Sequence, residues 1–330
     1  MGCDGKIMRR AMQRFEADRQ QRRQRFLERE ESIYRRQPRL REIDAQLRGT
    51  MSRIIASALR KGMDPQPALQ ALRDENLGLQ REKAALLEKM GLLPDCLEEK
   101  PSCPLCGDTG YRNGQVCRCL RNYYAREQQK ELSRLLDMTG QSFETFSLEW
   151  YSDDYNSNLG ISPRKNMQWI FNTCRRYADH FGPDSGSLLL TGQPGLGKTF
   201  LSACIAREVS GEGWSVVYDT AAHVFERFET QKFGRDQGEA DDDVTRILSC
   251  DLLILDDLGT EMTTAFVQSA LYRIVNTRLM ERRATIINTN IRSEELGDRY
   301  TPQIASRIEG EYQVLPFFGE DIRKLKRERS

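Results

Sequence analysis

A glycine-rich run ending in lysine and threonine lies between an apolar run and a helical pattern. Its residues are Gly192, Gln193, Pro194, Gly195, Leu196, Gly197, Lys198 and Thr199, directly after the apolar run 187–191. Glycines let backbone N–H groups turn inward around phosphates, Lys198 reaches the β and γ oxygens, and the Thr199 hydroxyl can ligate Mg²⁺. Strand, loop and helix are the context that a phosphate-binding loop requires, so the sequence predicts a nucleotide site.

Two adjacent carboxylates supply the second half of such a site. The run Leu252-Leu-Ile-Leu ends in Asp256 and Asp257, which is the pattern of a buried strand ending in acidic residues. A chance glycine turn does not account for a loop, its flanking elements and distal carboxylates together. The Asn-Lys-x-Asp pattern of guanine-specific sites is absent, which favours ATP as the nucleotide.

Four cysteines form two close pairs around a glycine-rich loop. They are Cys103, Cys106, Cys117 and Cys119. Two pairs on tight turns can form a tetrahedral four-thiolate Zn²⁺ site, which has no open coordination position and is therefore structural. A redox or iron–sulfur role and unligated cysteines are the alternatives, and Cys96 is a weaker candidate fifth ligand. Cys174, Cys204 and Cys250 are expected to be buried apolar residues, and His180 and His223 to have packing or surface roles.

Composition limits the classes of protein that the chain can represent. Its 330 residues allow two or three domains, and no apolar run reaches the roughly 18 residues of a membrane span. The N-terminus lacks the features of a secretion signal, which favours the cytoplasm. Residues 1–61 hold 17 Lys and Arg against 8 Asp and Glu. This basic segment can attract nucleic acid or an acidic protein face, or can simply be a solvated helix.

The arrangement of patterns along the chain predicts three regions. Residues 1–95 are helical, with a hairpin of helices over 40–58 and 68–90 whose seam includes Asn76 and Lys83, and with a frayed or partner-dependent helix over 1–39. Residues 96–140 form the cysteine module and a helix over 121–137. In residues 141–330 a helix over 164–181 precedes strands that alternate with helices, which predicts an α/β fold with a five-stranded parallel sheet. The predicted strands are 187–191, 215–219, 251–256, 284–289 and 312–317.

Five features in this order resemble the AAA+ ATPases of the DnaC/DnaI helicase-loader family, with the IstB-type transposition helpers as neighbours. They are the glycine-rich loop, Asp256-Asp257-Leu-Gly259, Thr289-Asn290, Ser306-Arg307-Ile308 and Gly319-Glu-Asp-Ile-Arg323. The resemblance covers roughly residues 140–330. A cysteine module before such an ATPase resembles the DnaI-type loaders.

This resemblance implies a role for each polar residue. Asp256 would hold Mg²⁺ and Asp257 would orient or deprotonate the attacking water, although most AAA+ proteins have Glu at that place. Asn290 resembles the polar sensor near the γ-phosphate, Arg323 the second sensor, and Arg307 the arginine finger offered to a neighbouring subunit. Asn290 can instead cap a turn, and Arg307 can instead form a surface salt bridge.

One segment combines aromatic and cationic residues. Lys232, Phe233 and Arg235 are weak candidates for contacts with single-stranded DNA through stacking and phosphate pairing. Phe225 and Phe228, at a helical interval, are expected to face the core.

The sequence therefore predicts an ATPase, with ATP, Mg²⁺ and Zn²⁺ as cofactors. We expect a loader that contacts a hexameric replicative DNA helicase through residues 1–140, self-assembles through residues 141–330 and places the helicase on single-stranded DNA. The alternatives are an IstB-type transposition helper acting on duplex DNA and an ATP-binding adaptor that does not hydrolyse ATP.

Overall fold

The computed structural model describes the chain except residues 1–3, 59–65, 136–140, 158–159, 235–236 and 330. The chain divides into two compact units. The first combines Met1–Gln13 with Arg118–Ser330, and the second is Arg14–Cys117. Among the described residues, no helix is both long enough and apolar enough to cross a membrane.

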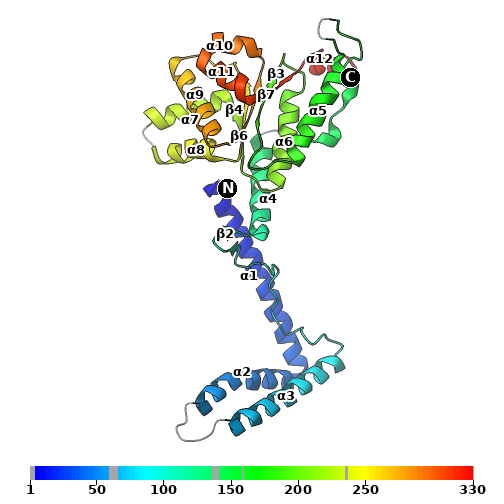
Figure 1. The fold of residues 1–330 in the computed structure, drawn as a ribbon. Coiled ribbons are helices and arrows are strands. Elements are labelled where there is room, and N and C mark those ends of the chain that lie inside the picture. The colour runs from blue at the N-terminus through cyan, green and yellow to red at the C-terminus, as the bar shows by residue number, and fades with distance from the viewer. Residues whose placement is uncertain (1–3, 59–65, 136–140, 158–159, 235–236, 330) are drawn as a thin grey trace. The chain divides into compact units, whose positions relative to one another are not determined.

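A five-stranded parallel sheet forms the centre of the first unit (Figure 1), in the order β4-β5-β6-β3-β7. The strands are β3 (Ser187–Thr191), β4 (Val216–Thr220), β5 (Leu252–Leu258), β6 (Ala284–Thr289) and β7 (Tyr312–Pro316). Each lies within one or two residues of its predicted position. The predicted α/β fold is confirmed.

Helices cover both faces of this sheet, because its central strands are apolar on both sides. Leu188 and Leu190 pack into a core with α5 and α6, whereas Leu189, between them, packs into a second core with α7, α8, α9 and α11. The helices of this unit are α4 (Arg118–Leu135), α5 (Pro163–Asp179), α6 (Lys198–Gly211), α7 (Ala221–Phe233), α8 (Gln237–Ser249), α9 (Ala265–Met280), α10 (Leu296–Arg299), α11 (Pro302–Glu311) and α12 (Ile322–Arg329). Short 3₁₀ turns lie at Phe143–Thr145, Leu148–Trp150 and Ser293–Glu295.

The second unit contains the predicted helical hairpin, formed by α2 (Pro38–Ala58) and α3 (Gln66–Lys89). The polar seam residues are paired across it. Lys83 Nζ donates to Asp44 Oδ1 at 2.6 Å, and Thr50 Oγ1 donates to Asn76 Oδ1 at 2.8 Å. These pairs satisfy polar groups that would otherwise destabilise the seam.

The frayed or partner-dependent helix predicted over 1–39 is an ordered helix in the described residues, and whether a partner affects it stays a prediction. Helix α1 (Gly5–Arg36) is continuous. Apolar residues near both of its ends are buried. Ile7 and Ala11 are buried in the first unit. Ile33 and Tyr34 are buried in the second unit, where they pack against Leu40. The polar stretch between these anchors is mostly exposed.

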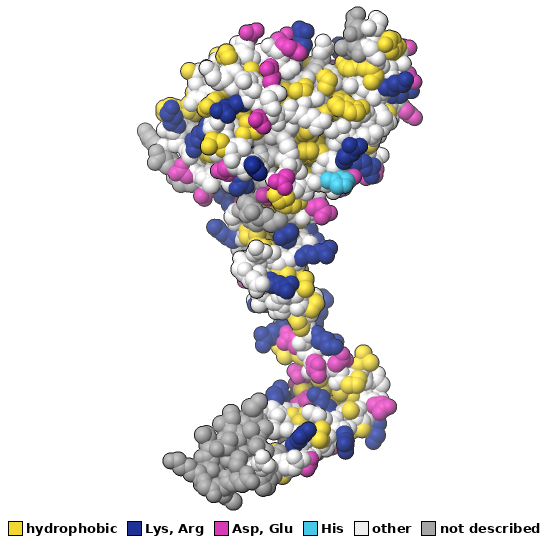
Figure 2. Space-filling model, in the orientation of Figure 1, with side chains coloured by type: hydrophobic (Ala, Val, Ile, Leu, Met, Phe, Trp, Pro, Cys, Tyr) yellow, Lys and Arg dark blue, Asp and Glu magenta, His cyan; other side chains and the backbone are white. Residues whose placement is uncertain are grey.

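Basic side chains of the first unit are spread over the face seen in Figure 2. On the face seen in Figure 2, Lys and Arg side chains alternate with Asp and Glu side chains and with apolar ones. This visible face therefore offers no single large cationic patch.

Candidate nucleotide site and cysteine cluster

The glycine-rich loop connects β3 to the first turn of α6. Gly192, Gly195 and Gly197 have φ values of 140°, 80° and 95°, which other residues rarely adopt. A Cβ on Gly192 would also lie 2.2 Å from the Phe317 carbonyl oxygen. The loop therefore requires glycine to bring its backbone close to β7.

Lys198 begins α6 and is largely buried beside the loop. Its Nζ donates to the carbonyl oxygens of Gly192 at 2.5 Å and Gln193 at 2.8 Å. Burial lowers the pKa of Lys198, while the nearby carboxylates of Asp257 and Asp256 act in the opposite direction. A cation held by carbonyl oxygens at the start of a helix is placed to exchange them for phosphate oxygens.

The two carboxylates near the C-terminal end of β5 have different surroundings. Asp256 is buried, and its Oδ1 accepts a hydrogen bond from Thr199 Oγ1 at 3.2 Å. A hydroxyl and a carboxylate this close form an oxygen donor set that fits Mg²⁺. Asp257 has a φ of 55° and lines the adjoining cavity. Its pKa is raised by partial burial and by the charge of Asp256, while Lys198 and Arg323 lower it.

A cavity of 450 Å³ joins these groups. Asn290, which follows β6, and Arg323, from α12, line it together with Lys198, Thr199 and Asp257. Helix α12 is tied to the loop through its first residue, because the backbone N–H of Ile322 donates to the Gly195 carbonyl at 3.0 Å. The fold thus brings both predicted sensor residues to the glycine-rich loop.

The cavity also has an aromatic wall that the sequence patterns did not predict. Phe146, Trp150, Tyr151 and Phe200 line it. The Phe146 ring stacks on Tyr151 with centroids 6.0 Å apart, and the Tyr151 hydroxyl donates to the Leu196 carbonyl at 3.0 Å. Such a wall suits the flat face of a nucleobase. The aromatic spacing of residues 143–151 was the available signal, but it lies far from the loop in sequence.

Arg307 lies outside this cavity, on α11. Its guanidinium stacks over the Tyr272 ring of α9 at 5.4 Å from the centroid, and its Nη2 donates to the Tyr272 hydroxyl at 3.3 Å. It lines a separate hollow with Met280 and Gln303. Arg307 therefore does not join the nucleotide-site residues of its own chain.

The candidate DNA contacts lie at the end of α7. Lys232 and Phe233 are exposed, and Lys232 Nζ lies 5.3 Å from the Phe233 ring centroid and 5.5 Å from that of Phe266. Arg235 lies outside the described residues. Phe225 and Phe228 are buried, as predicted.

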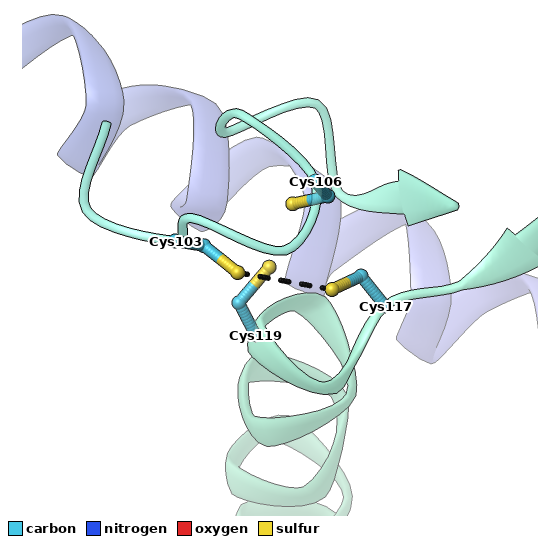
Figure 3. Close-up of side chains that lie close together, drawn as sticks. All are labelled: Cys103, Cys106, Cys117 and Cys119. Atoms are coloured by element: carbon cyan, nitrogen blue, oxygen red, sulfur yellow. Dashed lines mark hydrogen bonds between the residues drawn. The ribbon is translucent and has the colours of Figure 1, made fainter. Parts of the chain in front are cut away.

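The four cysteines of the predicted metal site converge (Figure 3). The Sγ atoms of Cys103, Cys106, Cys117 and Cys119 all lie within 4.8 Å of one another. This separation and donor type fit a tetrahedral Zn²⁺ site. The carboxylate of Asp108 shapes the first turn by accepting the backbone N–H groups of Ser102 at 2.9 Å and Cys103 at 2.8 Å.

The other predicted cysteines and histidines have the expected surroundings. Cys174, Cys204 and Cys250 are buried, and burial raises the pKa of each thiol. Cys96 is outside the cysteine cluster and packs beside Leu97 and its neighbours. His180 and His223 lie at the surface.

The parallel sheet, the phosphate-binding loop after β3 and the two carboxylates near the C-terminal end of β5 define a P-loop ATPase domain of the AAA+ class. The profile of the IstB-like ATP binding protein family matches residues 153–330, and the chain belongs to this family.

Individual relatives also match part of the chain. The replicative helicase loader DnaC of Escherichia coli (strain K12) is 29% identical over 135 residues, which is 41% of this chain and 54% of DnaC. The uncharacterized protein YdaV of the same strain is 26% identical over 145 residues, 44% of this chain and 57% of YdaV. The chain thus spans about half the length of these relatives.

Two solved structures also align with part of this chain. A crystal structure of the DnaC helicase loader aligns with a TM-score of 0.45 and 21% identity, covering 55% of this chain and 99% of that one. A crystal structure of DnaI aligns with a TM-score of 0.44 and 21% identity, covering 57% and 94%.

Proposed function

We propose that this protein is an ATP-dependent loader that delivers a replicative DNA helicase onto single-stranded DNA. The observation that supports it most is the 450 Å³ cavity, in which Lys198, Asp257, Asn290 and Arg323 meet from four separate segments. The similarity to the replicative helicase loader DnaC supports a replicative helicase as the protein that is loaded. ATP binding drives self-assembly of the ATPase domain, and hydrolysis resets it.

Each residue of the site has a separate role in the proposed ATPase cycle. Lys198 and the loop N–H groups bind the phosphates of ATP, and Thr199 and Asp256 hold Mg²⁺, which when bound neutralises charge on the phosphates. Asp257 orients the attacking water and accepts its proton, while Asn290 helps to fix that water. Arg323 contacts the γ-phosphate within the chain, and Arg307 acts on the nucleotide of a neighbouring chain.

The other proposed roles are partner binding, self-assembly and DNA contact. We assign partner binding to residues 1–140, made of a helical region (1–95) and a Zn²⁺ module with its linker helix (96–140), and we assign assembly to residues 141–330. Convergence of the four thiol groups supports the Zn²⁺ assignment. Lys232, Phe233 and Arg235 are the proposed DNA contacts. They are supported by the exposed Lys232 cation at the end of α7, which lies beside the rings of Phe233 and Phe266.

The family match favours a second candidate function. Because the matching family is IstB-like, a transposition helper that assembles on duplex DNA is the alternative. An adaptor that binds ATP without hydrolysing it is a third, since Asp257 stands where a longer carboxylate is usual.

A loading assay tests the proposal. The full-length protein is mixed with a hexameric replicative helicase and circular single-stranded DNA, and helicase retained on the circle is measured after gel filtration. We expect ATP-dependent retention that Lys198→Ala abolishes. Equal retention without this protein would contradict the loader function. So would a pull-down with the full-length protein as bait that recovers a transposase and not a helicase.

A further inference from the structure

The buried carboxylate of Asp256 is held by donors from several elements. Its Oδ1 accepts from Asn288 Nδ2 at 2.8 Å, from the backbone N–H of Asp257 at 3.0 Å and from Thr199 Oγ1 at 3.2 Å. Its Oδ2 accepts from the Tyr218 hydroxyl at 2.7 Å. These hydrogen bonds therefore fix the direction of both oxygens. The backbone of the strand alone would not fix the orientation of the carboxylate.

Two of these donors come from neighbouring strands and share a third residue. Asn288 lies on β6 and Tyr218 on β4, on either side of β5. The Ser202 hydroxyl oxygen, on α6, accepts from Asn288 Nδ2 at 2.7 Å and lies 3.1 Å from the Tyr218 hydroxyl.

The stability of the fold alone does not favour an asparagine at position 288. The side chain is fully buried, and its Oδ1 has no hydrogen-bond partner among the described residues. An unpaired buried acceptor is destabilising, and an apolar side chain of similar shape would avoid that loss. What the amide supplies is a donor at a fixed place beside Asp256 Oδ1.

We propose that Tyr218 and Asn288 are positioning residues for Mg²⁺ binding. They hold the Asp256 carboxylate in the one plane that presents Oδ1 beside the Thr199 hydroxyl. Hydrogen-bond partners behind a metal-binding group fix its direction and tune its affinity without touching the metal. This inference rests on the proposed binding of ATP with Mg²⁺ at the glycine-rich loop.

The test compares Tyr218→Phe and Asn288→Leu with the wild-type chain in nucleotide-binding titrations. Binding of a fluorescent ATP analogue is measured over a range of Mg²⁺ concentrations and again in EDTA, and Mn²⁺ binding in the presence of ADP is followed by electron paramagnetic resonance. We expect about tenfold weaker Mg²⁺ and Mn²⁺ binding in each variant. Nucleotide affinity in EDTA should stay at the wild-type value, which also shows that each variant is folded.

Tyr177→Phe is the matched control, because the Tyr177 hydroxyl donates to the Gly186 carbonyl away from the cavity. Wild-type metal dependence in both test variants would overturn the inference while leaving the proposed function intact. So would an equal loss of affinity with and without Mg²⁺, because that result indicates damage to the fold only. A wild-type chain that binds no nucleotide would overturn the proposed function itself.

Discussion

Asp256 and Asp257 are adjacent in sequence, yet the fold gives them opposite surroundings. Asp256 is 5% exposed and accepts hydrogen bonds from four donors. Asp257 is open to the cavity and adopts a left-handed backbone conformation, with a φ of 55°. Strain of this kind persists where the surrounding structure enforces it, and it is common at functional sites. The difference suits a fixed metal-holding group beside a group that exchanges a proton.

Replacing Asp257 by Asn is expected to stabilise the nucleotide-free protein. Partial burial and the charge of Asp256 raise the pKa of Asp257, so its charged form is disfavoured in the folded state. Asn removes the charge and tolerates the left-handed conformation. We expect the unfolding temperature at pH 7 to rise by about 1–2 °C, a small shift because solvent in the cavity screens the charge.

The sign of the pH dependence follows from the raised pKa. The gain of Asp257→Asn should be complete above the folded-state pKa and should vanish as the pH falls toward 3.8, the unfolded value, where wild-type Asp257 is itself neutral. Asp256→Asn is the control and should be destabilising, because it disrupts hydrogen bonds to a buried carboxylate. Thermal unfolding between pH 4 and pH 8 measures both, and a gain independent of pH would contradict the assignment.

ATP binding and ATP hydrolysis should depend on different residues of the site. Lys198→Ala removes the loop's own cation from the phosphates and is expected to abolish ATP binding. Asp257→Ala leaves that cation in place, so it should bind ATP normally and lose hydrolysis by a factor of about 100 or more. Equilibrium titration and phosphate release measure the two properties. Equal loss of binding in both variants would show that Asp257 serves the fold of the loop.

At the scale of elements, local patterns predicted the strands well because each strand has a short apolar run bounded by turn residues. β3 and β6 match their predicted ranges, and the glycine-rich loop lies between the expected strand and helix. Contacts between distant segments were not predictable in this way. Tyr218 and Asn288 meet at Asp256 only because β4, β5 and β6 are neighbours in the sheet, and Phe146 reaches the cavity from outside the sheet altogether.

The cysteine cluster should behave as a metal-dependent element. Two Gly-rich turns and a two-stranded hairpin, β1 (Tyr111–Arg112) with β2 (Gln115–Val116), offer little apolar core. We expect one Zn²⁺ per chain, and we expect Cys103→Ser or Cys119→Ser to make residues 95–125 sensitive to protease while ATP binding persists. Metal analysis and limited proteolysis provide the measurements.

Cys96→Ser is the control for this prediction, since Cys96 lies outside the cluster. It should retain both the metal and the protease resistance. A wild-type protein that contains no metal and still resists protease in this region would contradict the Zn²⁺ assignment.

At the scale of the whole molecule, the position of Arg307 suggests that the ATPase is completed by a second chain. Lys198, Asp257, Asn290 and Arg323 share one cavity, whereas Arg307 lines a different hollow and stacks on Tyr272. A guanidinium that stabilises the transition state must lie at the γ-phosphate. In the proposed assembly, Arg307 meets that requirement only at the nucleotide of a neighbour.

Mixing two inactive variants tests this arrangement. Arg307→Ala should bind ATP normally and lose DNA-stimulated hydrolysis, because the charge that develops on the neighbour's γ-phosphate is not compensated. Lys198→Ala cannot bind ATP but still offers its arginine. Co-assemblies of the two should therefore recover hydrolysis, since an intact nucleotide site of one variant adjoins an intact Arg307 of the other. Crosslinking verifies co-assembly, and mixtures that assemble without hydrolysing more than either variant alone would show that Arg307 acts within its own chain or only on structure.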